Sequence, residues 1–148
     1  MPIKLNPTPS RLPYRHFLGP STRPARHFSS TCAPHLSRAD LTLSDPSAAQ
    51  RIVREATALV EGEGAKWHLS AHGAGLERPF RFKTFGATWA FMSEVAEECK
   101  RQRHHPEWMN VYTRTEIRWT THEPRGLGVK DLAMARFCDE CGARHGEV

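Results

Sequence analysis

The sequence lacks the features of several common protein classes. No apolar run approaches the ~20 residues that a membrane-spanning helix needs. Cysteine is scarce as well: four residues in 148 are too few for a disulfide-stapled secreted domain, so we expect free thiols in a reducing compartment. The motifs GxGxxG, GxxxxGK[ST], GxSxG and HExxH are all absent. The familiar nucleotide-binding, serine hydrolase and zinc protease families are therefore not indicated.

Acidic residues are missing from the first part of the chain, residues 1–39. This segment holds six of the 21 Lys and Arg residues and none of the 16 Asp and Glu residues, so the remainder carries 15 basic and 16 acidic side chains. The net charge of +5 therefore comes from the segment and not from the rest of the chain. We expect no direct nucleic-acid partner and no membrane partner.

The same segment has seven of the eleven prolines and is rich in Ser, Thr and Arg. This composition cannot build a core, and it is more typical of a mitochondrial transit peptide than of a secretory signal. Arg26, Phe28 and Thr31 are similar to the processing signals of mitochondrial presequences, with cleavage expected after Phe28 and a candidate second cleavage after His35. We expect a mitochondrial matrix protein; the alternative is a disordered basic extension on a cytoplasmic or nuclear protein.

Residues 40–148 predict a single domain, with folding beginning near Leu41. Asp45 followed by Pro46 is typical of a helix N-cap and first helical position, and apolar residues at helical spacing continue to Val60. The pieces KWHLSA and PFRFK, separated by HGAG, then predict a hairpin within residues 66–83. Pro79 indicates that its second strand is an edge strand or begins there.

A second helix is predicted from its N-cap Thr84 to about Gln102, since apolar residues recur along one face. That expected face consists of Phe85, Trp89, Met92, Ala96 and Cys99. Pro106 stops the helix, and two strands are expected at about 108–112 and 115–122, joined by a turn at Thr113 and Arg114. A last helix follows at about 129–142.

The predicted element order is α-β-β-α-β-β-α. It favours an α+β fold, a four-stranded antiparallel sheet with helices packed on one face. Because such a sheet has an open edge, we expect a homodimer or a homotetramer.

Three histidines are the candidates for chemistry. His104 and His105 connect the second helix to the third strand, and His122 ends the fourth strand. If these two strands pair, His122 comes close to Trp108 and to the histidine pair. Imidazoles so grouped suit acid and base catalysis or metal binding, because they exchange protons near neutral pH. A histidine pair at a helix end can also simply contact the terminal carbonyls.

A CxxC pair, Cys138 and Cys141, is followed by His145. Zinc would need a fourth ligand and usually a second pair at matching spacing, which the sequence lacks. Both cysteines lie on the apolar stripe of the last helix, so core packing is favoured over metal or redox chemistry. We expect no metal and no cofactor.

Several separated positions resemble the pterin-4a-carbinolamine dehydratases, also known as dimerization cofactors of a homeodomain transcription factor. These positions are Lys100, HHPEW from His104, Tyr112, TTHE from Thr120, and Asp131 after GLGVK. The resemblance covers about residues 41–142 and implies the predicted fold. It also implies a lyase that dehydrates 4a-hydroxytetrahydrobiopterin to quinonoid dihydropterin and water, in tetrahydrobiopterin recycling. The alternative is a non-catalytic partner of a transcription factor.

The resemblance also implies site residues. His104, His105 and His122 would be catalytic, and the pterin would be bound by Pro106, Trp108, Thr121, Glu123 and Asp131. Two of these assignments have alternatives. Trp108 can instead pack in the core, and Asp131, the third residue of the last helix, can cap free N–H groups rather than support a histidine.

Overall fold

The computed structural model describes residues 35–148. Most of the expected transit peptide lies outside the described residues, together with the site after Phe28 and with Cys32. Leu36 is already part of the core, and its backbone N–H donates to Glu61 Oε1 at 2.7 Å. Packing thus starts a few residues ahead of Leu41. Within residues 35–148, no helix is long and apolar enough to cross a membrane.

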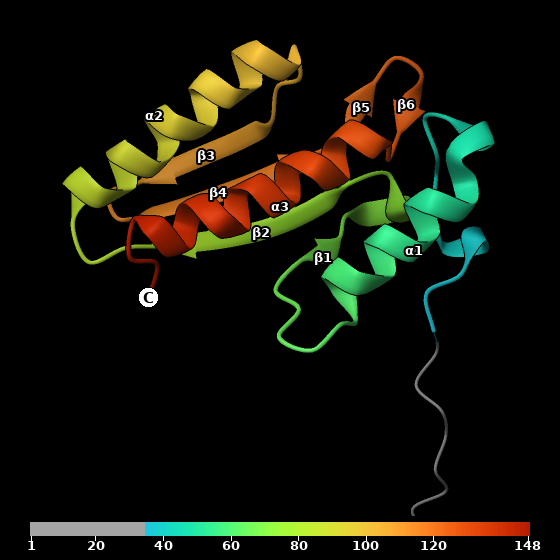
Figure 1. Ribbon diagram of the computed structural model, residues 1–148, viewed down its shortest axis with the longest axis horizontal. Helices are drawn as coiled ribbons and strands as arrows, with labels where there is room; N and C mark the ends of the chain where they lie inside the picture. The colour runs from blue at the N-terminus through green and yellow to red at the C-terminus, as the bar shows by residue number, and fades with distance from the viewer. Residues whose placement is uncertain (1–34) are drawn as a thin grey trace, which may run out of the picture. The chain divides into compact units, whose positions relative to one another are not determined.

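Four strands form an antiparallel sheet in the order β1-β2-β4-β3, and helices cover one of its faces (Figure 1). The strands are β1 (His68–Leu69), β2 (Leu76–Arg81), β3 (Glu107–Val111) and β4 (Arg114–Trp119). The helices are α1 (Ala49–Val60), α2 (Phe85–Gln102) and α3 (Val129–Arg144), with short 3₁₀ turns at Arg38–Asp40, Pro46–Ala48 and Ala71–Gly73. A second, two-stranded sheet consists of β5 (Thr121–His122) and β6 (Arg125–Gly126). The predicted α+β class is confirmed.

Helix α3 packs over the middle of the sheet, across β2 and β4 (Figure 1). Beneath it, Arg78 of β2 is almost fully buried and forms ion pairs with Asp139 of α3 and with Glu147. The indole N–H of Trp67 also donates to Asp139, at 2.8 Å. Because a buried guanidinium needs such partners, these contacts fix α3 on the sheet.

Two helix N-caps predicted from the sequence are confirmed. The Asp45 carboxylate accepts from the backbone N–H of Ser47, and the Thr84 hydroxyl accepts from the backbone N–H of Ala87. These bonds satisfy N–H groups that have no partner within the helix.

The prediction for Pro79 was wrong for β2 as a whole, but Pro79 itself has a neighbouring strand on one side only within residues 35–148. β2 begins at Leu76, lies between β1 and β4, and holds Pro79 in its interior. The proline is tolerated because β1 pairs with Leu76 and Glu77 only, which leaves that side of β2 open farther along.

The predicted apolar face of α2 was also wrong in part. Phe85 and Trp89 are 44% and 58% exposed, whereas Phe91, Val95 and Glu98 are buried. The helix is therefore rotated about its axis relative to the prediction. Glu98 is held inside by Arg101 and Gln102, which both donate to its carboxylate.

The fourth strand ends earlier than predicted. β4 stops at Trp119, because Thr120 turns inward and its hydroxyl donates to the Ala74 carbonyl oxygen at 2.7 Å. His122 therefore belongs to β5 and not to the end of the fourth strand. The turn between β3 and β4 lies at Tyr112 and Thr113, one residue before the predicted position.

Candidate functional site

The end of α2 fixes the position of His104. Arg103 adopts the left-handed conformation (φ 48°, ψ 49°), and the His104 N–H donates to the Cys99 carbonyl oxygen at 3.1 Å. This is the bond pattern of a Schellman cap. The His104 ring then stacks on Trp119, with ring centroids 5.5 Å apart, and its side chain is 11% exposed. His104 is therefore held between the helix end and the sheet.

Asp131 is a fully buried carboxylate in the first turn of α3. Its Oδ2 accepts from the Gly128 N–H at 2.7 Å and from the Thr121 hydroxyl at 2.9 Å, and its Oδ1 lies 2.6 Å from His104 Nε2. Asp131 thus fulfils both roles that the sequence left open, since it caps the helix and contacts a histidine.

The bond to Asp131 decides which nitrogen of His104 is available for chemistry. An ionised carboxylate can only accept hydrogen bonds, so with Asp131 ionised the proton of a neutral His104 ring lies on Nε2, which donates a hydrogen bond to Oδ1. Nδ1 remains as the nitrogen that can take up or release a proton. Such a pairing orients the imidazole and stabilises its charged form.

His122 forms an ion-pair group with Glu107. Its Nε2 is 3.6 Å from Glu107 Oε1, and both side chains are well exposed. Arg118 of β4 donates to the other Glu107 oxygen at 3.1 Å, and its Nε is 3.5 Å from Glu77. Because Glu107 and Arg118 are partners in the β3–β4 ladder, this charged row lies on the sheet face away from the helices.

The other predicted residues are placed around these two groups. His105 and Glu123 are exposed, and Pro106 is half-buried. Trp108 pairs in register with the buried Ile117 and therefore points to the helix-covered face, where it is 38% exposed. Among residues 35–148, no hydrogen bond joins one of the three histidines to another.

Sequence reasoning missed Glu107, although it lies next to the histidine pair. The available signal was its register with Arg118, which only the correct pairing of β3 and β4 reveals. A hollow of about 580 Å³ lies against the sheet and is bordered by Glu107, Trp108 and Arg118 among other residues. It adjoins the group of His122 and does not include His104 or Asp131.

Comparisons with known proteins show the family to which this α+β chain belongs. The family model described as pterin 4 alpha carbinolamine dehydratase matches residues 50–141. The chain belongs to this family.

Relatives are found in bacteria. A Bordetella avium protein, provisionally named a pterin-4-alpha-carbinolamine dehydratase, is 37% identical over 97 residues, which span 66% of this chain and 90% of the relative. A Novosphingobium aromaticivorans protein with the same provisional name is 45% identical over 71 residues, 48% of this chain and 74% of the relative. The crystal structure of a transcriptional coactivator/pterin dehydratase from Brucella melitensis is similar with a TM-score of 0.55 and 28% identity; the match covers 68% of this chain and 99% of that one.

The contacts of Asp131 predict a loss of stability in Asp131→Asn. The substitution keeps the size of the side chain, but it removes the negative charge that three donors share. We expect the free energy of unfolding to fall by about 2 kcal/mol, a value typical of hydrogen bonds to charged groups. Urea unfolding measures this change, with the exposed Glu140→Gln on the same helix as the control. Equal stability of the two variants would show that Asp131 is not the shared acceptor.

Proposed function

We propose that this protein dehydrates 4a-hydroxytetrahydropterins, the pterin-4a-carbinolamines, to quinonoid dihydropterins and water, in the recycling of tetrahydrobiopterin. The observation that carries the proposal is the 2.6 Å contact between His104 and the buried Asp131, in a member of the pterin-4a-carbinolamine dehydratase family. It supplies an oriented imidazole whose side chain is 11% exposed.

The reaction needs one proton given and one proton taken. The bond from C4a to the hydroxyl oxygen breaks as that oxygen is protonated, water leaves, and N5 loses its proton as the C4a–N5 double bond forms. The acid gives one proton to the substrate and the base takes one from it. The total number of protons on the enzyme is therefore unchanged. Imidazoles suit both steps near neutral pH.

We assign the base to His104. Removal of the N5 proton makes an imidazolium, and the Asp131 carboxylate stabilises that charge. His122 is assigned as the acid that protonates the leaving hydroxyl, with Glu107 supporting its charged form from 3.6 Å. His105, which is exposed and follows His104 in the sequence, is assigned to the pterin pocket together with Pro106, Thr121 and Glu123.

Histidine substitutions test this assignment. We expect His104→Gln and His122→Gln to lower kcat by a factor of about 10² to 10⁴, the range for loss of a general acid or base. Turnover of the 4a-carbinolamine, measured in a coupled hydroxylase assay, gives kcat directly. The control is His72→Asn, because His72 lies in the turn after β1 at φ 63°, a conformation that asparagine tolerates. Wild-type turnover in both glutamine variants would refute histidine catalysis.

We propose that residues 1–35 direct the chain to mitochondria and are removed there. The support is the composition of the segment and the position of Leu36, which is the first core residue within residues 35–148 and would be kept by cleavage after His35.

Microscopy of a C-terminally tagged chain, with mass measurement of the recovered protein, tests this import. We expect mitochondrial fluorescence and a product that begins after Phe28 or His35. An uncleaved chain in the nucleus would contradict import and favour the alternative function, partnership with a transcription factor.

We also propose that the chain forms a homo-oligomer through the exposed edge of the sheet. Within residues 35–148, β3 has a neighbour on one side only, and apolar side chains are exposed on it and beside it. These are Met109, Val111 and Tyr112, with Phe85 stacked on Tyr112 at 6.3 Å. Apolar groups so close together are typical of a surface that is covered in the assembled protein.

A charge placed on this edge should weaken the assembly. Val111→Lys is expected to convert the oligomer to smaller species, because an edge lysine opposes strand pairing. Light scattering after size-exclusion chromatography measures the mass, and Arg81→Lys, on the neighbouring sheet surface, serves as the control. An unchanged mass for Val111→Lys would place the interface elsewhere.

A further inference from the structure

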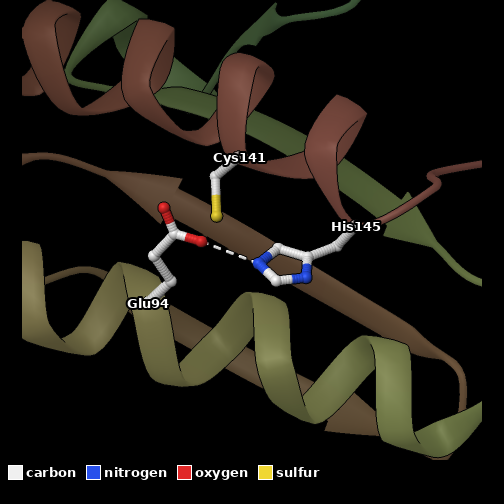
Figure 2. Close-up of side chains that lie close together, drawn as sticks. All are labelled: Glu94, Cys141 and His145. Carbon is white, nitrogen blue, oxygen red and sulfur yellow. Dashed lines mark hydrogen bonds and ion pairs between the residues drawn. The ribbon is translucent and has the colours of Figure 1, made fainter.

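The C-terminal end of α3 carries a second cluster of reactive side chains, which the proposed dehydration does not use. Cys141 and His145 are four residues apart, so they share one face of the helix end, and Glu94 of α2 points toward them (Figure 2). One ligand atom from each residue lies within 4.8 Å of the other two. Asp131 precedes Cys141 by ten residues on the same helix, a distance of about 15 Å along its axis. The cluster is therefore separate from the histidine site.

We propose that Glu94, Cys141 and His145 bind a zinc ion, with water in the fourth position. Zinc accepts sulfur, nitrogen and oxygen ligands together, whereas magnesium and calcium prefer oxygen alone. Zinc–ligand bonds of about 2.0 to 2.3 Å place neighbouring ligand atoms about 3.3 to 3.8 Å apart. The present separations, from 2.7 Å between Glu94 Oε2 and His145 Nε2 up to at most 4.8 Å, bracket that spacing.

The carboxylate of Glu94 is already oriented for this role. Its Oε2 lies 2.7 Å from His145 Nε2, while Arg144 donates to Oε1. The guanidinium thus fixes one oxygen and leaves the other directed at the cluster, which is how outer groups orient metal ligands. Zinc would replace the proton that Glu94 and His145 now share.

The surroundings provide both an enclosed side and an entrance. Cys141 is fully buried, and its sulfur lies 3.9 Å from the Phe91 carbonyl oxygen. The side chains of His145 and Glu94 are 25% and 38% exposed, so an ion can enter from solvent on their side. One wall of the site is therefore part of the core and the other faces water.

An ion pair between α2 and α3 would explain Glu94, Arg144 and His145 but not the thiol. Exposed ion pairs contribute little to stability and need no sulfur beside them. Burial, assisted by the Glu94 carboxylate, raises the pKa of Cys141 to about 12. The thiol is therefore protonated without a cation, and zinc binding would release its proton.

Cobalt and zinc titrations of the full-length protein, after treatment with a chelator, test the site. Cobalt serves as the probe because a cobalt–thiolate bond gives a charge-transfer band in the near ultraviolet. We expect one cobalt ion to bind per chain and to give this band. Added zinc should displace the cobalt ion and remove the band. Zinc should also raise the Tm of the wild-type chain, because it binds the folded state.

Variants of each ligand and a matched control complete the test. Cys141→Ala should abolish the cobalt band, and Glu94→Gln and His145→Gln should each weaken zinc binding at least tenfold and remove the rise in Tm. Cys138→Ala, a buried thiol one turn earlier on α3, should bind metal like the wild type. If Cys141→Ala fails to fold, Glu94→Gln and His145→Gln still test zinc binding, because these two side chains are partly exposed.

Any one of three results would overturn the proposal. These are a wild-type chain without the cobalt–thiolate band, a band that persists in Cys141→Ala, and zinc affinity that is unchanged in Glu94→Gln and His145→Gln. It does not rest on the dehydratase proposal, since none of these measurements uses turnover.

Discussion

The site depends on one buried charge, the carboxylate of Asp131. A carboxylate without contact to water needs hydrogen-bond donors for its oxygens, or it costs several kcal/mol. Asp131 obtains its donors from three parts of the chain: the end of α2 through His104, β5 through Thr121, and the backbone N–H of Gly128 before α3. The carboxylate is satisfied only when these parts are packed together. The same contact that stabilises the fold thereby orients the imidazole.

Helix α3 links this site to the rest of the molecule. Its first turn holds Asp131, and its middle is bound to the sheet through Asp139 and the buried Arg78. Its last turn faces Glu94 of α2, where we infer a zinc site. Charged groups therefore fix α3 along its whole length. The two proposed functions lie at opposite ends of the helix, so metal binding is expected to stabilise the fold rather than to take part in dehydration.

The sequence predicted those features that depend on neighbouring residues. The caps at Asp45 and Thr84 are local contacts, and the element order follows from hydrophobic spacing and proline positions. The rotation of α2 about its axis could not be predicted from neighbouring residues. The spacing of apolar residues shows that the helix has an apolar stripe, but it does not show which residues of the stripe contact the sheet. Phe85 and Trp89 are left exposed, while Glu98 is buried with partners on its own helix.

The site itself was predicted as a set of residues and not as a set of contacts. His104 and Asp131 were both selected, yet their bond spans the fold and depends on how α2 ends. The expected cluster of three imidazoles rested on a fourth strand that reaches His122. The inward turn at Thr120 ends that strand early, so His122 belongs to β5, where its Nε2 lies 3.6 Å from Glu107. Glu94 was not connected with Cys141 and His145, because nothing in a linear pattern brings α2 to the end of α3.

We infer that the Asp131 carboxylate accepts a hydrogen bond from His104 Nε2–H, so that Nδ1 carries no proton in the neutral ring. The tautomer of His104 tests it directly and is measured by long-range ¹H–¹⁵N correlation NMR on the neutral imidazole. We expect the Nε2–H form in the wild-type protein and a mixture of both forms in Asp131→Asn. An Nδ1–H tautomer in the wild type, or the same tautomer ratio in both proteins, would contradict the account.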